Sequence, residues 1–129
     1  MKKKKKTLAK LKKETQVIFN NYIRNRDTLM GQTFRCISCG EIFPVKEMNA
    51  GHYAPVKFYD WLRFYEDNCH SQCRRCNLYK RGNLIFYTWN LIKKIGSKRY
   101  NCLLLKMKNR KPYTREDIEK IKIKYGSNI

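Results

Sequence analysis

The stretch NCHSQCRRCN, residues 68–77, contains the second of two Cys-x2-Cys pairs, and these pairs decide how the chain folds. The second pair is Cys73 and Cys76; the first, Cys36 and Cys39, precedes it with 33 residues between them. Four thiolates in two such pairs form the tetrahedral shell of a structural zinc ion and leave no position open for chemistry. We therefore predict one structural Zn²⁺, whose binding contributes about 10 to 16 kcal/mol in small zinc domains.

The cysteine content and the N-terminal sequence both indicate a protein of the reducing cell interior. Six cysteines are present, and in such a compartment they are expected as metal ligands rather than disulfides. The N-terminal lysines lead into TLAKLKKETQ instead of an apolar signal core, and no apolar run reaches the roughly 18 residues that span a bilayer. We expect a cytoplasmic protein without a membrane partner. Cys102 follows a helical pattern beside three leucines and is expected in the core.

The length of 129 residues and the hydrophobic content of 42% suit one packed domain. Apolar residues spaced by three or four predict a helix over residues 8–27. Extended segments should flank the first cysteine pair, and a short helix should follow the second. Further helices are expected beyond residue 85, the last one capped by Thr114 and Asp117. The result is an α+β fold with a basic helical extension (1–30), a zinc-stapled ββα core (31–84) and a basic helical region (85–129).

The net charge of +20 is concentrated at the two ends of the chain. Residues 1–27 contain ten Lys or Arg against two acids, and residues 78–129 contain fourteen against three, whereas residues 28–77 contain six against five. This division predicts a polyanion partner, DNA in particular. The lysine run at 2–6 is equally well explained as a solubilising segment. The expected phosphate contacts are Lys57, Arg63, Arg74, Arg75, Lys80 and Arg81.

Four polar residues near the cysteines are not needed for the zinc shell. They are His52, Asn68, His70 and Asn77. A zinc-clasped hairpin would bring GHY of one strand opposite NCH of the other and place Asn77 above both, so that two imidazoles and two carboxamides converge. A single histidine is more often a satisfied polar residue than a ligand, but the four together predict a second, reactive site.

At these residues the chain resembles a known family. The segments CISCG, AGHYAPV, LRFYEDNCHSQCRRCN and YKRGNLIFY look like those of the phage NinG (Rap) recombination endonucleases, within the HNH/treble-clef nuclease superfamily. The resemblance implies a treble-clef, HNH-like ββα-metal core. It also implies a structure-specific endonuclease that cuts branched DNA, such as a Holliday junction or a flap, in the host cytoplasm. Symmetric cutting of a junction would suit a homodimer.

The resemblance assigns a role to three residues by position. His52 matches the first HNH histidine, which acts as the general base, and Asn68 matches the central Asn that braces its loop. Asn77 takes the third position, which binds the catalytic Mg²⁺ or Mn²⁺.

One position departs from the superfamily pattern. The residue before the base is commonly a metal ligand, but here it is Gly51, which has no side chain to offer. His70 is the expected replacement, and Glu66 and Asp67 are the alternatives. The metal shell is therefore predicted as Asn77 with His70.

Two other functional classes remain open on the sequence. A non-catalytic zinc module that binds nucleic acid would explain the charge and the cysteines, but it would leave the histidines without a role. A scaffold for a recombination complex would use the lysine tail as its contact. Aromatic residues between 53 and 65 are expected mainly in the core, with some free to stack on unpaired bases.

Overall fold

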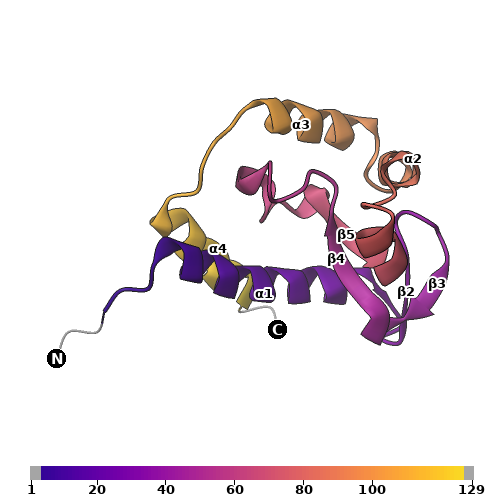
Figure 1. Ribbon diagram of the computed structural model, residues 1–129, viewed down its shortest axis with the longest axis horizontal. Helices are drawn as coiled ribbons and strands as arrows, with labels where there is room; N and C mark the ends of the chain where they lie inside the picture. The colour runs from indigo at the N-terminus through magenta and orange to yellow at the C-terminus, as the bar shows by residue number, and fades with distance from the viewer. Residues whose placement is uncertain (1–3, 127–129) are drawn as a thin grey trace.

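The computed structural model describes residues 4–126, which form a mixed α+β domain (Figure 1). The predicted combination of helices and short strands is confirmed. The helices are α1 (Leu8–Asp27), α2 (Leu84–Ile95), α3 (Ser97–Lys108) and α4 (Arg115–Gly126). The strands are β1 (Thr28–Leu29), β2 (Thr33–Arg35), β3 (Ile42–Pro44), β4 (Met48–His52) and β5 (Cys69–Cys73).

Helix α1 occupies the range that its apolar spacing predicts. The hydroxyl of Thr7 caps it by accepting a hydrogen bond from the Lys10 amide at 3.2 Å. Its buried residues are four positions apart, so they form one stripe along the helix; they are Leu11, Thr15, Phe19 and Ile23. Lys10 and Lys13 are exposed to solvent, whereas Lys12 pairs with the Asp60 carboxylate at 2.7 Å.

Strands β4 and β5 form the antiparallel hairpin on which the candidate site is built. Their register places Gly51 opposite His70 and His52 opposite Cys69. Residues directly opposite each other point to the same face of a hairpin, and neighbours along a strand point to opposite faces. Strand β5 begins directly after Asn68, which belongs to a 3₁₀ turn (Glu66–Asn68).

The hairpin lies between two helical layers (Figure 1), with α1 and α4 on one side and α2 and α3 on the other. Each layer encloses its own cluster of buried apolar side chains: the first core contains residues of α1 and α4, and the second contains residues of α2 and α3. Cys69 belongs to the first core, and Ala54 and Leu62 of the connection after β4 belong to the second. The first core also contains Leu11, Phe19, Ile23, Phe64, Ile118 and Tyr125. The second also contains Ile37, Tyr87, Leu91, Ile95 and Leu103. The two layers hold the strands in place and bury all five residues of β5, whereas His52 at the end of β4 is half-buried.

The last helix begins as its capping signature predicts. The Asp117 amide donates to the Thr114 hydroxyl at 3.1 Å, and the Thr114 amide donates to the Asp117 carboxylate at 2.9 Å. These two reciprocal bonds satisfy backbone donors that would otherwise lack partners at the start of α4. Helix α4 then packs beside α1, so segments from the two ends of the chain share one core (Figure 1).

The expectation for Cys102 is wrong, because its side chain is exposed on α3. The next residue, Leu103, takes the core position instead. Of the aromatic residues between 53 and 65, most are packed against the cores, as expected, whereas Phe58 is 68% exposed. Among residues 4–126, none of the helices is long and apolar enough to cross a membrane.

Candidate functional site

The four paired cysteines form one cluster. The Sγ atoms of Cys36, Cys39, Cys73 and Cys76 all lie within 4.8 Å of one another, and those of Cys39 and Cys73 are 3.9 Å apart. A tetrahedral site with Zn–S bonds of about 2.3 Å requires sulfur atoms roughly 3.8 Å apart. The donor set and its spacing therefore fit a structural zinc ion, as the sequence predicts.

Polar groups around the cluster point at the sulfur atoms. The amide of Cys39 donates to the Cys36 sulfur, and the amide of Cys76 donates to the Cys73 sulfur, each at 3.4 Å. The Asn83 carboxamide approaches the Cys76 sulfur at 3.6 Å. Such donors stabilise thiolates and fix the orientation of metal ligands. Cys69 is excluded from this role, because it lies in the first core and burial raises the pKa of its thiol.

Asn68 is fully buried and ties together the connection between β4 and β5. Its side-chain oxygen accepts a hydrogen bond from the Ala54 amide at 2.7 Å. Its side-chain nitrogen donates to the carbonyls of Ala54 and Leu62, both at 3.1 Å. Removing these three bonds would leave buried polar groups of the loop without partners. Asn68 therefore braces the segment that follows His52.

His52 ends β4 and is held by one hydrogen bond. Its Nε2 lies 3.0 Å from the Arg63 carbonyl, which can only accept, so Nε2 carries the proton. Nδ1 then has a free lone pair, and within residues 4–126 it has no hydrogen-bond partner. Burial lowers the pKa of His52, so the ring is neutral at physiological pH. The ring is therefore a base fixed in one tautomer.

The predicted convergence of His52 and His70 is wrong. The register puts His70 opposite Gly51 and thus on the other face of the hairpin from His52. Its Nε2 pairs with the Asp67 carbonyl at 2.8 Å. Its Nδ1 faces two cations, the Lys94 ammonium at 2.9 Å and the Arg26 guanidinium at 3.1 Å.

These contacts remove His70 from the expected ligand set. A metal cation would have to displace both positive groups from Nδ1, and the other ring nitrogen is already used. Burial, with the charges of Lys94 and Arg26, lowers the pKa of His70 to about 3. Asp67, one alternative ligand, is paired with Arg99. Glu66, the other, accepts hydrogen bonds from Tyr22 and Tyr125.

The cations around His70 are balanced in part by Asp27 at the end of α1. Arg26 and Lys94 contact the Asp27 carboxylate at 2.8 and 2.9 Å, and the Ser71 amide donates to it at 2.9 Å. Burial alone would raise the pKa of Asp27, but Arg26 and Lys94 overcome this and lower it to about 2. This cluster of Arg26, Asp27, His70 and Lys94 joins α1, β5 and α2. Asp27 and Lys94 are 67 residues apart in the sequence, so no local sequence pattern predicts their contact.

His70 is expected to make stability depend on pH below its ordinary pKa of 6.5. The unfolded chain takes up a proton there, whereas the folded chain resists protonation down to about pH 3. The contribution is complete above pH 6.5 and is lost as the pH falls, by about 1.4 kcal/mol per unit. Urea unfolding of wild type and His70→Gln between pH 7.5 and 5.5 should therefore give a shallower loss in the variant. Equal slopes in the two proteins would contradict this reading.

The structure explains why position 51, directly before His52, is a glycine. A Cβ on Gly51 would lie 2.0 Å from the side-chain oxygen of Gln72, which is 1% exposed. Gln72 is held there by donating to the Ser38 hydroxyl at 2.9 Å and to the Gly82 carbonyl at 2.7 Å. A ligand side chain at position 51 and this placement of Gln72 exclude each other. The carboxamide of Gln72 thus occupies the space where such a ligand would stand.

Asn77 lies in a π-helical turn, Arg75–Tyr79, directly after the second cysteine pair. The Lys80 amide closes this turn on the Arg75 carbonyl at 3.1 Å. Turns of this kind are frequent at functional sites. Within residues 4–126 the Asn77 side chain makes no hydrogen bond, to His52 or to any other residue. The structure therefore leaves Asn77 available but not assembled with the base.

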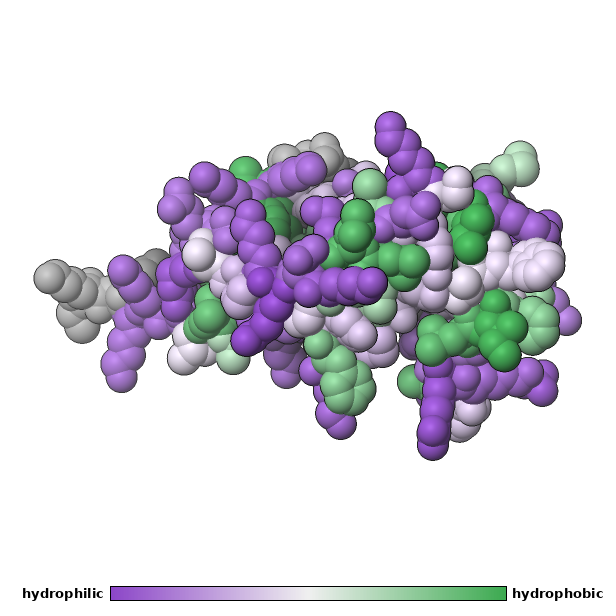
Figure 2. Space-filling view, turned by 90° about the horizontal axis from the view of Figure 1, so that it is seen from above, coloured by the Kyte–Doolittle hydropathy of each residue, from purple (hydrophilic) through white to green (hydrophobic). Residues whose placement is uncertain are grey.

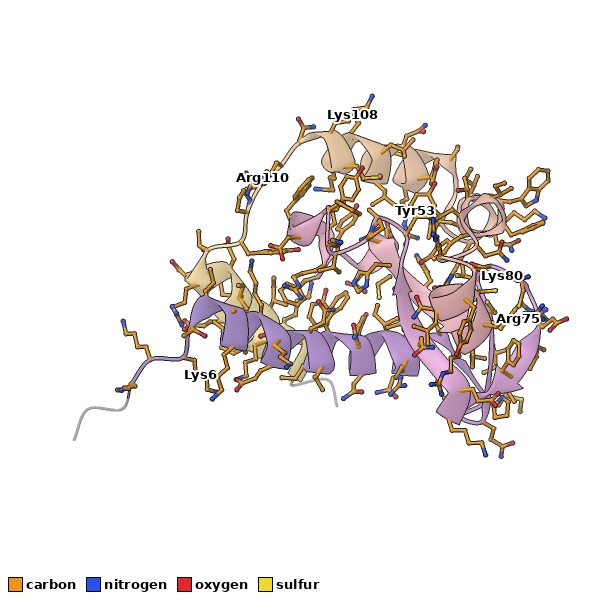
Figure 3. The ribbon with its side chains drawn as sticks, viewed as in Figure 1. Lys6, Tyr53, Arg75, Lys80, Lys108 and Arg110 are labelled. Atoms are coloured by element: carbon orange, nitrogen blue, oxygen red, sulfur yellow. The ribbon has the colours of Figure 1, made fainter. Side chains whose placement is uncertain are left out.

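The six predicted phosphate contacts fall into two groups. Five are exposed: Lys57, Arg74, Arg75, Lys80 and Arg81. Arg75 and Lys80 lie at the same end of the molecule (Figure 3) and line one pocket together with Cys73 and Cys76. Arg63 differs, since its guanidinium donates to the side-chain oxygen of Gln16 and to the Asp60 carboxylate, each at 2.9 Å, and its side chain is 18% exposed. Arg63 therefore forms a structural ion pair with Asp60 and differs from the five exposed residues as a candidate phosphate contact.

Comparisons with known proteins identify the family. The family model described as bacteriophage lambda NinG protein matches residues 1–129. The chain is similar to protein NinG of Escherichia phage 933W (38% identity over 117 residues), Escherichia phage lambda (37% over 117) and Salmonella phage P22 (36% over 117). These matches cover 91% of this chain but 55%, 54% and 55% of the relatives, so the chain spans about half their length. No solved structure matches. The chain belongs to the NinG family.

Proposed function

We propose that the chain is a metal-dependent endonuclease that hydrolyses phosphodiester bonds in branched DNA. The observation that carries this proposal is His52, a neutral imidazole anchored by Nε2 at the end of β4, with a free lone pair on Nδ1. Two paired strands followed by a five-residue helical turn, clasped by four cysteines, support this proposal, because an HNH-like core has two strands and a helix in that order.

Hydrolysis needs a group that accepts a proton from the attacking water. His52 supplies it through Nδ1, because the Arg63 carbonyl holds the proton on the other ring nitrogen. Asn68 keeps the base in place by bonding the loop that follows it. Because the pKa of His52 is lowered, this base stays unprotonated below the pH at which an ordinary histidine becomes protonated.

A divalent cation, Mg²⁺ or Mn²⁺, would neutralise charge that develops on the phosphate. Asn77 is the residue that would hold it, since its carboxamide makes no hydrogen bond within the described residues and belongs to the same turn as exposed Arg75. Gln72 is too buried to reach a phosphate without movement. The basic residues of the same turn would bind the DNA backbone, which sets position without reading sequence.

One observation favours a second function, a zinc module that binds DNA without cutting it. Within residues 4–126 no hydrogen bond links Asn77 to His52, and the other predicted ligand of the catalytic metal, His70, is engaged elsewhere. On that reading the hairpin only holds the basic surface in shape. The two proposed functions are distinguished by one result, since only the nuclease produces a cleaved strand.

The deciding experiment compares a labelled four-way junction, a flap and a linear duplex of the same sequence. Zinc-loaded protein is incubated with each, with Mg²⁺, with Mn²⁺ and with no added divalent metal. We expect cleavage of the branched substrates only, and only with added metal. Tight binding of all three without any cut strand would replace the nuclease with the binding module.

A further inference from the structure

Helix α2 carries apolar side chains on both of its faces. Its inward stripe, Tyr87, Leu91 and Ile95, is buried in the second core. On the other side lie four more apolar residues and one lysine, which at 100° per residue fall on one continuous face. We call them the outer α2 face: Ile85, Phe86, Trp89, Ile92 and Lys93.

This outer face is exposed. Ile85 is 81% exposed, Trp89 65% and Phe86 59%. Seen from above, green side chains gather at the end of the molecule where α2 lies (Figure 2). The inward stripe already supplies the packing of α2, so fold stability does not account for the outer one. Contiguous apolar surface of this kind marks a binding site.

The charges around the face restrict what can bind there. Residues 68–115 contain thirteen Lys or Arg and not one Asp or Glu, and of these cations Lys94 and Arg99 pair with Asp27 and Asp67 from outside the segment. A second copy of the chain would bring the same cations against these, and like charges brought together in an interface oppose association. The partner must therefore combine negative charge with apolar surface.

Unpaired nucleotides have this combination, whereas duplex DNA hides the faces of its bases in the stack. Single-strand binding surfaces use aromatic side chains for the bases and cations for the backbone. Here Lys93 Nζ lies over the Trp89 ring, 5.5 Å from its centre, so a cation and an aromatic ring that is 65% exposed are already in contact. Arg75 and Lys80 lie at the same end of the molecule (Figure 3).

We propose that the outer α2 face binds unpaired bases, with Phe86 and Trp89 stacking on them and Lys93 contacting the phosphates between. In this way it would favour DNA that has a single-stranded arm or an open branch point. The inference deepens the proposed function, because it names the feature of branched DNA that this chain recognises. Binding itself requires no cleavage and is tested separately.

The test measures affinity without added divalent metal for a single-stranded oligonucleotide and for a duplex of equal charge. Stacking contributes about 1 to 3 kcal/mol per base, so Trp89→Ala should weaken single-strand binding roughly 5- to 150-fold. Duplex binding should change less than about twofold, since it depends on phosphate contacts. Leu105→Ala, which removes another apolar side chain that is 60% exposed, on α3, is the matched control and should leave both affinities unchanged.

A second readout reports stacking directly. The single-stranded oligonucleotide should quench the tryptophan fluorescence of wild type, and Trp89→Phe should lose most of that quenching while retaining binding. Unchanged single-strand affinity in Trp89→Ala and Phe86→Ala would overturn the inference. So would an equal loss for duplex, tight binding to vesicles of anionic lipid that Trp89→Ala abolishes, or dimerisation through this face.

The outcomes also separate this inference from the nuclease proposal. A protein that never cuts DNA, but in which Trp89→Ala selectively weakens single-strand binding, would support the stacking surface and refute the nuclease. A protein that cuts branched DNA, and whose α2 variants bind single strands as wild type does, would do the reverse.

Discussion

Replacing Cys73 with serine is expected to unfold the hairpin and the turn that follows it. Cys73 supplies one of four thiolates in a cluster that joins β5 to the knuckle between β2 and β3. Zinc binding in such sites contributes about 10 to 16 kcal/mol, whereas a whole domain is stable by only about 5 to 15 kcal/mol. Loss of the ion therefore exceeds what the two small cores can offset.

Far-ultraviolet circular dichroism and zinc content per chain measure this effect. The variant should contain less than one zinc and lose its cooperative thermal transition, and a strong chelator should do the same to wild type. Cys102→Ser is the matched control, because Cys102 is exposed on α3 and outside the cluster; we expect a change within about 0.5 kcal/mol. A zinc-free Cys73→Ser protein that melts cooperatively near the wild-type temperature would refute the structural role.

The parts of the fold that depend on short-range patterns were predictable from the sequence. The spacing of Leu11, Phe19 and Ile23 defines α1, and Thr114 with Asp117 defines the start of α4. The two cysteine pairs predict their own cluster, because four soft ligands in that spacing have one common solution. In each case the residues that determine the element are the residues that form it.

The side chains around the hairpin could not be predicted in the same way. Strand alternation places His70 on a face, but what fills that face comes from Arg26 on α1 and Lys94 on α2. Their approach depends on how two helices pack, and no local pattern specifies it. Gln72 is similar, since hydrogen bonds to Ser38 and Gly82, from two other segments, hold its side chain where a Cβ on Gly51 would stand.

Helix α2 illustrates a third limit. The segment FYTWNLIKKIG is recognisable as a helix, but it is apolar around most of its circumference, so periodicity alone does not identify which stripe is buried. The structure buries Tyr87 and leaves its neighbour Phe86 in solvent. The Tyr87 hydroxyl donates to the Gly51 carbonyl at 2.6 Å, a contact that fixes the inward side. Because Tyr87 faces the core, Phe86 and Trp89 on the other side of α2 are exposed to solvent.

Changing His52 to alanine is expected to lower the rate of branched-DNA cleavage by roughly 10² to 10⁴ at pH 7.5, because a positioned general base contributes about that much. DNA affinity should change little, since the basic surface is not altered. The variant also frees the Arg63 carbonyl, so its thermal transition and zinc content must be matched to wild type. Single-turnover rates with saturating protein then report the chemical step alone.

The variant His70→Gln tests whether cleavage depends on His52 in particular or on either histidine of the hairpin. His70 lies on the other face of the hairpin, and glutamine can accept from Lys94 and donate to the Asp67 carbonyl much as the neutral ring does. We expect this variant to cleave within a few-fold of wild type, whereas His52→Gln should fail as His52→Ala does. Wild-type cleavage should also persist below pH 6.5, because the pKa of His52 is lowered. If both histidine variants cut at the wild-type rate, the base lies elsewhere, and the hairpin's contribution is to hold the basic surface against DNA.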